Sequence, residues 1–239
     1  MTGHSTSPES TPRIAVLIPA AGSGNRMGLT ENKVLLPVGG EPGLRHLVRL
    51  FSGIPGISNL ILLVKRGQQA AVQQALTGLD DSRLELLEGG AERQDSVRIG
   101  LEHLAKDPPH WVLVHDGARP LATRPLVERI LQALSDHPSA VPALPVTDTV
   151  RKRIGAATEV LPRENLFLVQ TPQGFHWKPL WDAHQTAKRE GFVGTDDAQL
   201  LEKSGISAYL VPGEYSNLKL TVAKDLLLAE VLYSLLAPE

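Results

Sequence analysis

A run of small and basic residues follows directly on the first apolar segment of the sequence. Residues 19–28 read PAAGSGNRMG, and Lys33 follows five residues later. Because Gly22 and Gly24 carry no side chain, their backbone N–H groups can approach phosphate oxygens closely. Arg26 and Lys33 can bring two positive charges to the same ligand. The spacing favours a loop that wraps a nucleoside triphosphate, although a tight glycine turn with two solvated cations also fits these residues.

Two other phosphate-binding motifs fit this loop less well. A dinucleotide-binding loop has the spacing G-x-G-x-x-G, whereas the third glycine here, Gly28, comes one residue too late. The next apolar segment also ends in Lys65 and Arg66, where that motif leads one to expect an acid. A Walker loop requires Gly-Lys-Ser/Thr, but Leu29 follows the glycine. The next helical pattern begins only near residue 42, which leaves a long loop.

Further polar residues follow the apolar segment 111–114. At the carboxyl end of a strand, Asp116 would meet the magnesium ion that bridges a triphosphate, or it would cap a turn or a helix. We interpret His115 as a core or turn histidine, because Mg²⁺ prefers oxygen ligands. Arg119 is expected either to reach a phosphate or to form an ion pair with Asp116. Thr195 precedes two acids and is expected to be the N-cap of a helix.

Strand and helix patterns alternate along the chain. Short apolar runs at residues 14–18, 60–64, 84–87 and 111–114 are typical of strands buried on both faces. Helical spacing joins Leu44, Leu47, Val48 and Phe51, then Val97, Gly100, Leu101 and Leu104, and finally Leu228, Val231, Leu232 and Leu235, where Thr221 is a candidate cap. The alternation predicts an α/β fold with a doubly wound, mostly parallel, Rossmann-like sheet and helices on both faces.

One segment, about residues 143–173, has no helical period. Its two extended halves flank Gly155 and predict a protruding β-hairpin arm that packs on a second subunit. A hairpin folded back on its own sheet is the alternative. Residues 14–235, with the arm included, are expected to form a single domain. Residues 1–13 are polar and read as a disordered tail, with a shortened transit sequence as the alternative.

Composition excludes several classes of protein. The 239 residues include no cysteine, which excludes disulfide scaffolds, thiolate zinc sites and cysteine nucleophiles, and fits a cytoplasmic enzyme. A net charge of -2 argues against duplex nucleic-acid binding. Three Trp, three Tyr and four Phe leave few rings for stacking single-stranded bases. No apolar run approaches the ~18 residues of a membrane span. The balance favours small-molecule chemistry.

Several motifs together carry a resemblance to a known family. The run 19–33 (PAAGSGNRMGLTENK) resembles the G-x-G-x-R…K signature of nucleotidyltransferases. Residues 89–97 (GGAERQDSV), 112–120 (VLVHDGARP), 170–175 (QTPQGF), 194–197 (GTDD) and 217–221 (NLKLT) follow in order. The ordered set resembles the 2-C-methyl-D-erythritol 4-phosphate cytidylyltransferase family. Val34 and Gly117 depart from it, since glutamine and alanine are common at these positions.

The resemblance implies attack by the acceptor's phosphate on the α-phosphorus of CTP, with Mg²⁺ as cofactor and a homodimer joined through the arm. It implies that Arg26 and Lys33 stabilise the transition state and that Arg163 and Lys219 hold the acceptor phosphate, four residues we group as catalytic. The residues expected to bind CTP are Ala20, Ala21, Gly22, Ser23, Gly24, Gly89, Gly90 and Ser96. Those expected to bind the acceptor are Asp116, Arg119, Thr149, Thr171 and Thr195, with Asp116 also meeting the metal.

Two other functions remain compatible with these residues. A ribitol 5-phosphate cytidylyltransferase would share the nucleotide loop, and its acceptor differs by little more than a branch and a hydroxyl. A nucleotide-sensing module would keep the loop without catalysis, but it would not need cations directed at both phosphates. Arg163 and Lys219 could also be ordinary surface cations.

Overall fold

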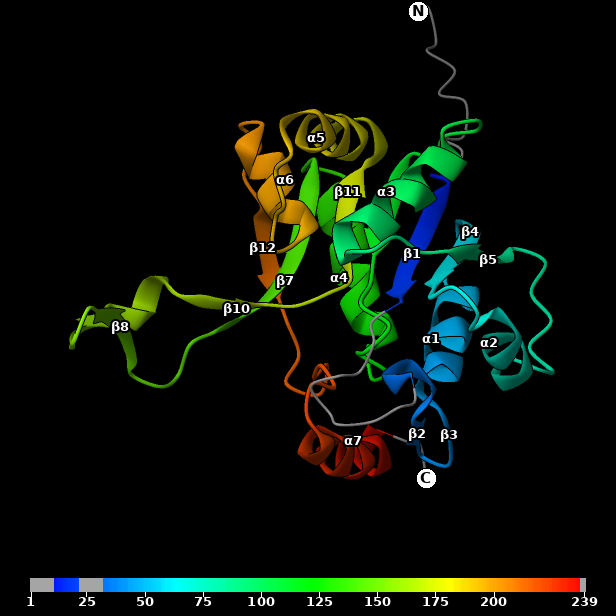
Figure 1. The fold of residues 1–239 in the computed structure, drawn as a ribbon, viewed down its shortest axis with the longest axis horizontal. Helices are drawn as coiled ribbons and strands as arrows, with labels where there is room; N and C mark the ends of the chain where they lie inside the picture. Colours follow the sequence, from blue (N-terminus) through cyan, green and yellow to red (C-terminus); the bar gives the residue numbers. More distant parts are fainter. Residues whose placement is uncertain (1–10, 22–31, 237–239) are drawn as a thin grey trace, which may run out of the picture.

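The computed structural model describes residues 11–21 and 32–236 (Figure 1). Four of the residues assigned to the nucleotide loop, Gly22, Ser23, Gly24 and Arg26, lie outside the described residues, as do residues 1–10 of the expected tail. Arg13 does not fit the expected disorder, because its guanidinium donates to Asp107 Oδ2 at 2.6 Å and its carbonyl accepts from His110 N. Arg13, which the sequence placed in the tail, is therefore bonded to the body of the protein.

A mixed sheet forms the centre of the molecule, and within the described residues it has eight strands. Its order is β10-β7-β11-β6-β1-β4-β5, with β12 also paired to β7. The pairs β1–β4, β4–β5, β1–β6 and β7–β12 are parallel, whereas β10 and β11 run antiparallel to their neighbours. The strands are β1 (Ile14–Ala20), β4 (Ile57–Val64), β5 (Leu84–Glu88), β6 (Trp111–Val114), β7 (Ser139–Pro145), β10 (Phe167–Val169), β11 (Gln173–His176) and β12 (Tyr209–Pro212). The predicted mostly parallel α/β fold is confirmed.

The chain reverses its direction of winding at β1. From β1 it proceeds outward to β4 and β5, and it then returns to β6 on the other side of β1. Ligands of doubly wound sheets bind beyond the carboxyl ends of the strands at such a reversal. The carboxyl ends of β1, β5 and β6 therefore lie at one edge of the sheet.

Helices cover both faces of this sheet. One apolar core joins it to α1 (Gly43–Ser52), α2 (Gln69–Ala75) and α4 (Arg124–Leu134), and a second core joins the other face to α3 (Arg93–Leu104), α5 (Trp177–Glu190) and α6 (Asp197–Lys203). The stripe predicted from Leu44, Leu47, Val48 and Phe51 is the buried face of α1. In this helix the period of the apolar residues identified both the element and its buried face.

The last helix, α7 (Ala223–Leu236), differs from its expectation. Leu228, Val231 and Leu235 are 51%, 58% and 76% exposed, whereas Ala229 is buried in a third, small apolar cluster. The helix is apolar on two sides, so its period could not identify the buried one. Thr221 is not its cap: the carboxylate of Asp225 accepts from Thr221 N at 2.6 Å and Val222 N at 2.8 Å.

The predicted arm is present but shorter than expected. It is a hairpin of β8 (Val150–Ile154) and β9 (Ala157–Leu161), followed by a 3₁₀ turn, η3 (Arg163–Asn165). Gly155 makes the turn with a φ of 59°, a conformation that glycine adopts without strain. The ends of the segment, β7 and β10, belong to the main sheet. The hairpin itself extends away from the body, so the alternative of a hairpin folded back on its sheet is wrong (Figure 1).

Small elements connect β1 to α1. They are η2 (Lys33–Leu35), β2 (Pro37–Val38) and β3 (Glu41–Pro42), of which the two strands pair with each other. Across the described ranges we find no helix with the length and apolar character that a membrane span requires.

Candidate active site

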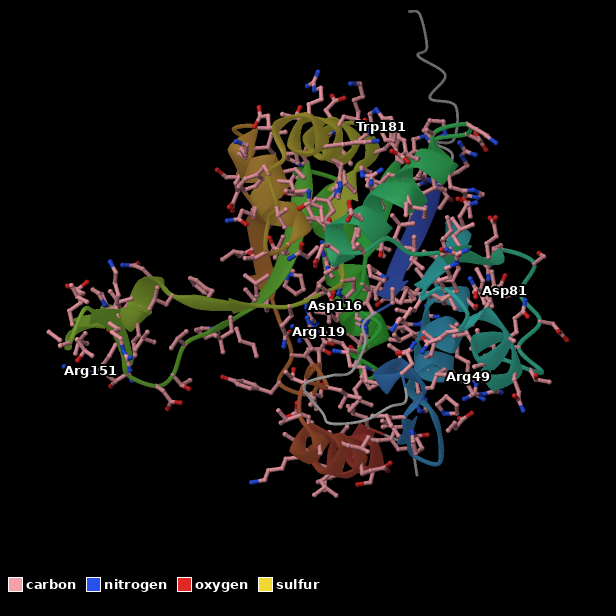
Figure 2. The ribbon with its side chains drawn as sticks, in the orientation of Figure 1. Arg49, Asp81, Asp116, Arg119, Arg151 and Trp181 are labelled. Carbon is pink, nitrogen blue, oxygen red and sulfur yellow. The ribbon has the colours of Figure 1, made fainter. Side chains whose placement is uncertain are left out.

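A pocket lies at the carboxyl edge of the sheet. Figure 2 shows Asp116 and Arg119 there, between the sheet and α7. The residues that line it are Arg93, Asp116, Arg119, Val169, Gln170, Thr171, Gln173, Asp196 and Lys219. Four residues predicted from the sequence therefore come together here, namely Asp116, Arg119, Thr171 and Lys219.

Asp116 lies between two cations. Its Oδ1 accepts from Arg93 Nε at 2.8 Å and its Oδ2 from Lys219 Nζ at 2.6 Å. Burial opposes ionisation of this carboxyl group, but the charges of Arg93 and Lys219 outweigh burial and hold its pKa well below the usual range. Asp116 is therefore charged at neutral pH, and it fixes the ammonium group of Lys219 in the pocket.

Arg93 connects the pocket to a buried charge network that the sequence did not reveal. Its Nη1 donates to Asp197 Oδ2 at 2.7 Å, and His184 Nε2 lies 3.0 Å from Asp197 Oδ1. Burial lowers the pKa of Arg93, but Asp197 and Asp116 outweigh burial and raise it overall. Arg93 Nη2 is buried and has no hydrogen-bond partner among the described residues. The position of Arg93 in the motif GGAERQDSV was the available signal, but nothing in it indicated the partners.

Arg119 does not pair with Asp116, contrary to one of the two expectations. Its guanidinium donates to Asn217 O at 2.7 Å and approaches Val169 O at 3.5 Å, and burial lowers its pKa. His115 is confirmed as a core histidine: its Nε2 lies 3.0 Å from Arg119 O, and burial lowers its pKa to about 4. A neutral imidazole therefore supports the turn that carries Arg119.

Polar residues in and beside the pocket fix the segment that carries Lys219. Thr171 Oγ1 accepts from Asp116 N at 3.0 Å, so its hydroxyl supports the site as well as lining it. Asn217 Nδ2 donates to Thr171 O at 2.7 Å, and Gln170 Nε2 donates to Glu214 O at 2.8 Å. Gln170 and Asn217 are buried, and neither was predicted as a functional residue. They stood inside quoted motifs, which was the only sequence signal.

The second predicted lysine approaches the same segment. Lys33 belongs to η2, and its Nζ lies 3.4 Å from the carbonyl oxygen of Leu220, the residue after Lys219. The chain thus brings Lys33 and Lys219 to one edge of the sheet although 186 positions separate them. Their expected partner, Arg26, lies outside the described residues.

Gly89, Gly90 and Ser96, which were expected to bind CTP, lie near the end of β1. Gly90 N donates to Ser96 Oγ at 3.0 Å, and Ser96 Oγ in turn donates to Glu92 O at 3.2 Å. A Cβ on Gly89 would stand 2.8 Å from Ser96 Oγ and 3.1 Å from the Cβ of Ala21. Ser96 therefore shapes the backbone of the two glycines, and Ala21, the residue after the end of β1, lies next to Gly89.

Three of the residues predicted to hold the acceptor or its phosphate do not line the pocket. Thr149 and Arg163 lie on the exposed arm, where Arg163 donates to Thr147 O. Thr195 is not the N-cap of α6, because Asp196 occupies that position and its side chain accepts from Gln199 N. Asp196, which does line the pocket, also accepts from Gln173 Nε2 at 2.7 Å. Thr195 and Asp196 are adjacent and both are good N-cap residues, so the sequence alone could not show which of them caps α6.

The residues of the site do not form a metal cage. Among the described residues no group of three or more His, Asp or Glu side chains could hold an ion. Asp116 offers oxygen, the element that Mg²⁺ prefers, but both of its oxygens already accept from cations. A protein-held magnesium site does not fit this donor set.

The two departures from the family pattern lie in contact with each other. A Cβ on Gly117 would stand 3.1 Å from Val34 Cγ1 and 3.2 Å from Pro19 O. We expect Gly117→Ala to lower the free energy of unfolding by about 1–2 kcal/mol through overpacking. Urea denaturation of Gly117→Ala, Val34→Ala and the double variant measures this effect. The double variant should cost less than the sum of the single changes, and simple additivity would contradict the contact.

Comparison with known proteins agrees with this geometry. The sequence profile of IspD, 2-C-methyl-D-erythritol 4-phosphate cytidylyltransferase, matches residues 14–234. The chain is 38% identical over 217 residues to the enzyme of that name from Bacillus thuringiensis, covering 90% of this chain and 95% of the relative. The crystal structure of 2-C-methyl-D-erythritol 4-phosphate cytidylyltransferase from Thermus thermophilus superposes with a TM-score of 0.77 at 38% identity, covering 93% of this chain and 99% of that one.

A longer relative carries a second activity in its name. The chain is 40% identical over 223 residues to the bifunctional enzyme IspD/IspF of Chelativorans, covering 91% of this chain and 54% of the relative. It thus spans about half the length of that protein and most of the length of the Bacillus enzyme. The matched profile, the relatives and the shared fold agree with the motifs gathered at the pocket, and the chain belongs to the IspD family of 2-C-methyl-D-erythritol 4-phosphate cytidylyltransferases.

Proposed function

We propose that the protein transfers the cytidylyl group of CTP to 2-C-methyl-D-erythritol 4-phosphate, a step of non-mevalonate isoprenoid synthesis. The products are 4-diphosphocytidyl-2-C-methyl-D-erythritol and pyrophosphate. The observation that carries this proposal is the convergence of Lys33 and Lys219 at the carboxyl edge of the sheet. Arg93 and Arg119 line the pocket together with Lys219, so its cations suit phosphate-bearing substrates.

The proposed reaction needs no general base. A phosphate monoester has a second pKa near 6, so its oxygen is largely ionised at neutral pH. That oxygen forms a bond to the α-phosphorus of CTP, and the bond from the α-phosphorus to the bridging oxygen breaks as pyrophosphate leaves. Lys33, with Arg26 by resemblance, stabilises the added charge at the α-phosphorus, and Lys219 holds the attacking phosphate. Asp116 keeps the Lys219 ammonium group in place by its 2.6 Å bond.

Magnesium belongs to this proposal as a component of the substrate. Mg²⁺ is commonly held by triphosphate oxygens and water with few protein ligands, and it neutralises charge on the triphosphate. We propose that the ion enters with CTP and that Asp116 acts chiefly on Lys219. Direct binding of the ion by Asp116, as expected from the sequence, would bring the ion close to the two cations that this carboxylate already binds.

Replacement of Asp116 by asparagine separates these two roles. If Asp116 positions Lys219, kcat should fall while the Mg²⁺ concentration for half-maximal activity stays unchanged, because the metal ligands are elsewhere. Initial rates over a Mg²⁺ titration at fixed CTP provide the measurement for the wild type and Asp116→Asn. A rise of ~10-fold or more in the Mg²⁺ requirement would instead assign a direct ligand role to Asp116.

We further propose that a homodimer forms through the arm and that the arm of one subunit completes the site of the other. Thr149 and Arg163 lie outside the pocket of their own chain, which supports this arrangement. The arm and β10 also expose apolar side chains: Ile154 is 51% exposed, Val160 55% and Leu168 59%. Exposed apolar residues grouped in this way favour burial against a partner.

Mixing two inactive variants tests the shared site. Lys33→Ala damages the body of a subunit and Arg163→Ala its arm. Random exchange of equal amounts should restore about a quarter of the wild-type sites, since half of the dimers would be mixed and each would hold one intact site. Pyrophosphate release before and after exchange gives the result. No recovery would place both residues in one chain's site, and a dimer that survives deletion of residues 150–164 in sedimentation would exclude the arm as the interface.

The activity itself is tested with the purified protein, Mg²⁺ and one nucleoside triphosphate at a time. We expect pyrophosphate release with CTP and 2-C-methyl-D-erythritol 4-phosphate, and little with ATP, GTP or UTP. Faster turnover with ribitol 5-phosphate would assign the alternative acceptor, and binding of CTP without release would identify a nucleotide-sensing module. The cytoplasmic location expected from the sequence stays a prediction.

A further inference from the structure

A buried asparagine stands directly before Lys33. Asn32 is 3% exposed, and its amide nitrogen donates to Ala20 O at 3.1 Å and to Gln68 Oε1 at 2.7 Å. Its amide oxygen accepts from Val34 N at 3.3 Å, and its backbone carbonyl accepts from Leu35 N at 2.9 Å. Both ends of this side chain are therefore bonded.

These bonds join three parts of the fold at one point. Ala20 is the last residue of β1, Gln68 precedes the first residue of α2, and Asn32 is the N-cap of η2, the turn that contains Lys33. The chain leaves β1 at Ala20 and has returned to within hydrogen-bond distance of it at Asn32. Burying an amide is costly unless its donors and acceptor are satisfied, so this set of bonds specifies one geometry.

The other neighbour of Lys33 is also fixed. Val34 is 2% exposed and faces Gly117, the residue after Asp116. Buried residues thus hold the backbone of Lys33 on both sides, one against the end of β1 and the other against the Asp116 turn. The Nζ of Lys33 meets Leu220 O, beside Lys219. The direction in which the Lys33 side chain extends therefore depends on the packing of Asn32 and Val34.

We propose that Asn32 is a positioning residue for Lys33, acting through Ala20 and Gln68. This inference rests on the proposed function, because positioning matters only if Lys33 acts on a reacting phosphate. By fixing the backbone of η2, Asn32 places the ammonium group where charge develops at the α-phosphorus. A misplaced stabilising group weakens the transition state more than the bound substrate, so loss of Asn32 should affect kcat more than CTP affinity.

Substitutions at positions 32 and 68 test whether the hydrogen bonds of Asn32 position Lys33. Asn32→Asp keeps the acceptor for Val34 N but places a second oxygen opposite Ala20 O, whereas Gln68→Glu keeps the acceptor that Asn32 uses. Asn59→Asp serves as a matched control, since Asn59 is a partly buried asparagine near the amino end of β4. The measurements are kcat, KM, CTP affinity by calorimetry, and thermal unfolding, for the three single variants and for Asn32→Asp/Gln68→Glu.

The expected pattern is specific to positioning. Asn32→Asp should lower kcat by ~10- to 100-fold with CTP affinity changed less than 3-fold, and Gln68→Glu should remain near wild type. The double variant should be worse than the product of the two single effects, because two carboxylates would face each other. Asn59→Asp should leave kcat unchanged. The inference would be overturned if Asn32→Asp and Asn59→Asp behaved alike, or if Asn32→Asp lowered kcat and CTP affinity equally. Either result would leave the proposed function intact. An inactive wild type would overturn both the inference and the proposed function.

Discussion

Replacing Lys33 with alanine is expected to lower kcat by about 10²- to 10³-fold, the usual loss when one preorganised charge on a transition state is removed. The affinity for CTP should change much less, because the ammonium group matters most when charge builds up on the α-phosphate. Single-turnover kinetics and calorimetric titration with CTP measure the two quantities separately. Lys33→Ala thus tests the role that family resemblance and the contact with Leu220 O assign to this residue.

A matched control removes a charge of the same sign nearby. Lys224, in the first turn of α7, is exposed and does not line the described pocket. Lys224→Ala changes the net charge equally and should leave kcat within about 2-fold of wild type, because exposed charges interact weakly through water. If Lys33→Ala lowered affinity and turnover to the same extent, Lys33 would be a uniform binding residue rather than a stabiliser of the transition state.

The second large effect is expected at Arg93. Arg93→Met leaves Asp197, whose side chain is 1% exposed, and Asp116, 10% exposed, without a principal counter-charge. Breaking a buried ion pair from one side costs about 3–5 kcal/mol, and we expect the lower end because the Arg93 side chain is itself 27% exposed. Urea denaturation at pH 7 gives the free energy of unfolding. Activity should fall as well, since Asp116 would lose the partner opposite Lys219.

The same helix offers the control for this change. Arg98 forms ion pairs with Asp95 and Glu102, but both carboxylates have side chains that are 40% exposed and can be hydrated when the arginine is removed. Arg98→Met should therefore cost less than about 1 kcal/mol. Similar losses for Arg93→Met and Arg98→Met would show that the buried network contributes no more than a surface pair.

The contribution of the Arg93 ion pairs to the free energy of unfolding should depend on pH. Burial opposes ionisation of Asp116 and Asp197, but their cationic partners outweigh burial and lower both pKa values in the folded protein. Their contribution is therefore complete above the pKa of the unfolded carboxyl group, near 3.9, and is lost as the pH falls below it. The difference between the wild type and Arg93→Met should shrink under acidic conditions, because protonated carboxyl groups no longer need the arginine.

Local patterns predicted the strands that form short apolar runs and the helix that has a single apolar face. The strands β1, β4, β5 and β6 and the buried face of α1 follow from short apolar runs and from the period of Leu44 to Phe51. The same method misassigned the buried side of α7, because leucines occur around most of that helix. Thr195 and Asp196 are both good caps, so only the backbone conformation could distinguish them.

The sequence predicted the site residues that belong to recognisable motifs. It did not predict the residues whose role depends on contacts with distant parts of the chain. Asp116, Arg119, Thr171 and Lys219 were identified, and the pocket unites them. The bonds from Arg93 to Asp116 and Asp197 span 23 and 104 positions, and no local pattern records such partners. Asn32 was missed for the same reason, since its amide reaches Gln68 across 36 positions.

The arm has a consequence for how stability is distributed over the chain. β8 and β9 pair with each other and with no other described strand, and a lone two-stranded hairpin is at best marginally stable in water. Its backbone amides should thus exchange hydrogen far faster than those of β1 and β4, which are central in the sheet. In the proposed dimer, part of the association free energy is spent on ordering the arm, so the occupancy of complete sites depends on protein concentration.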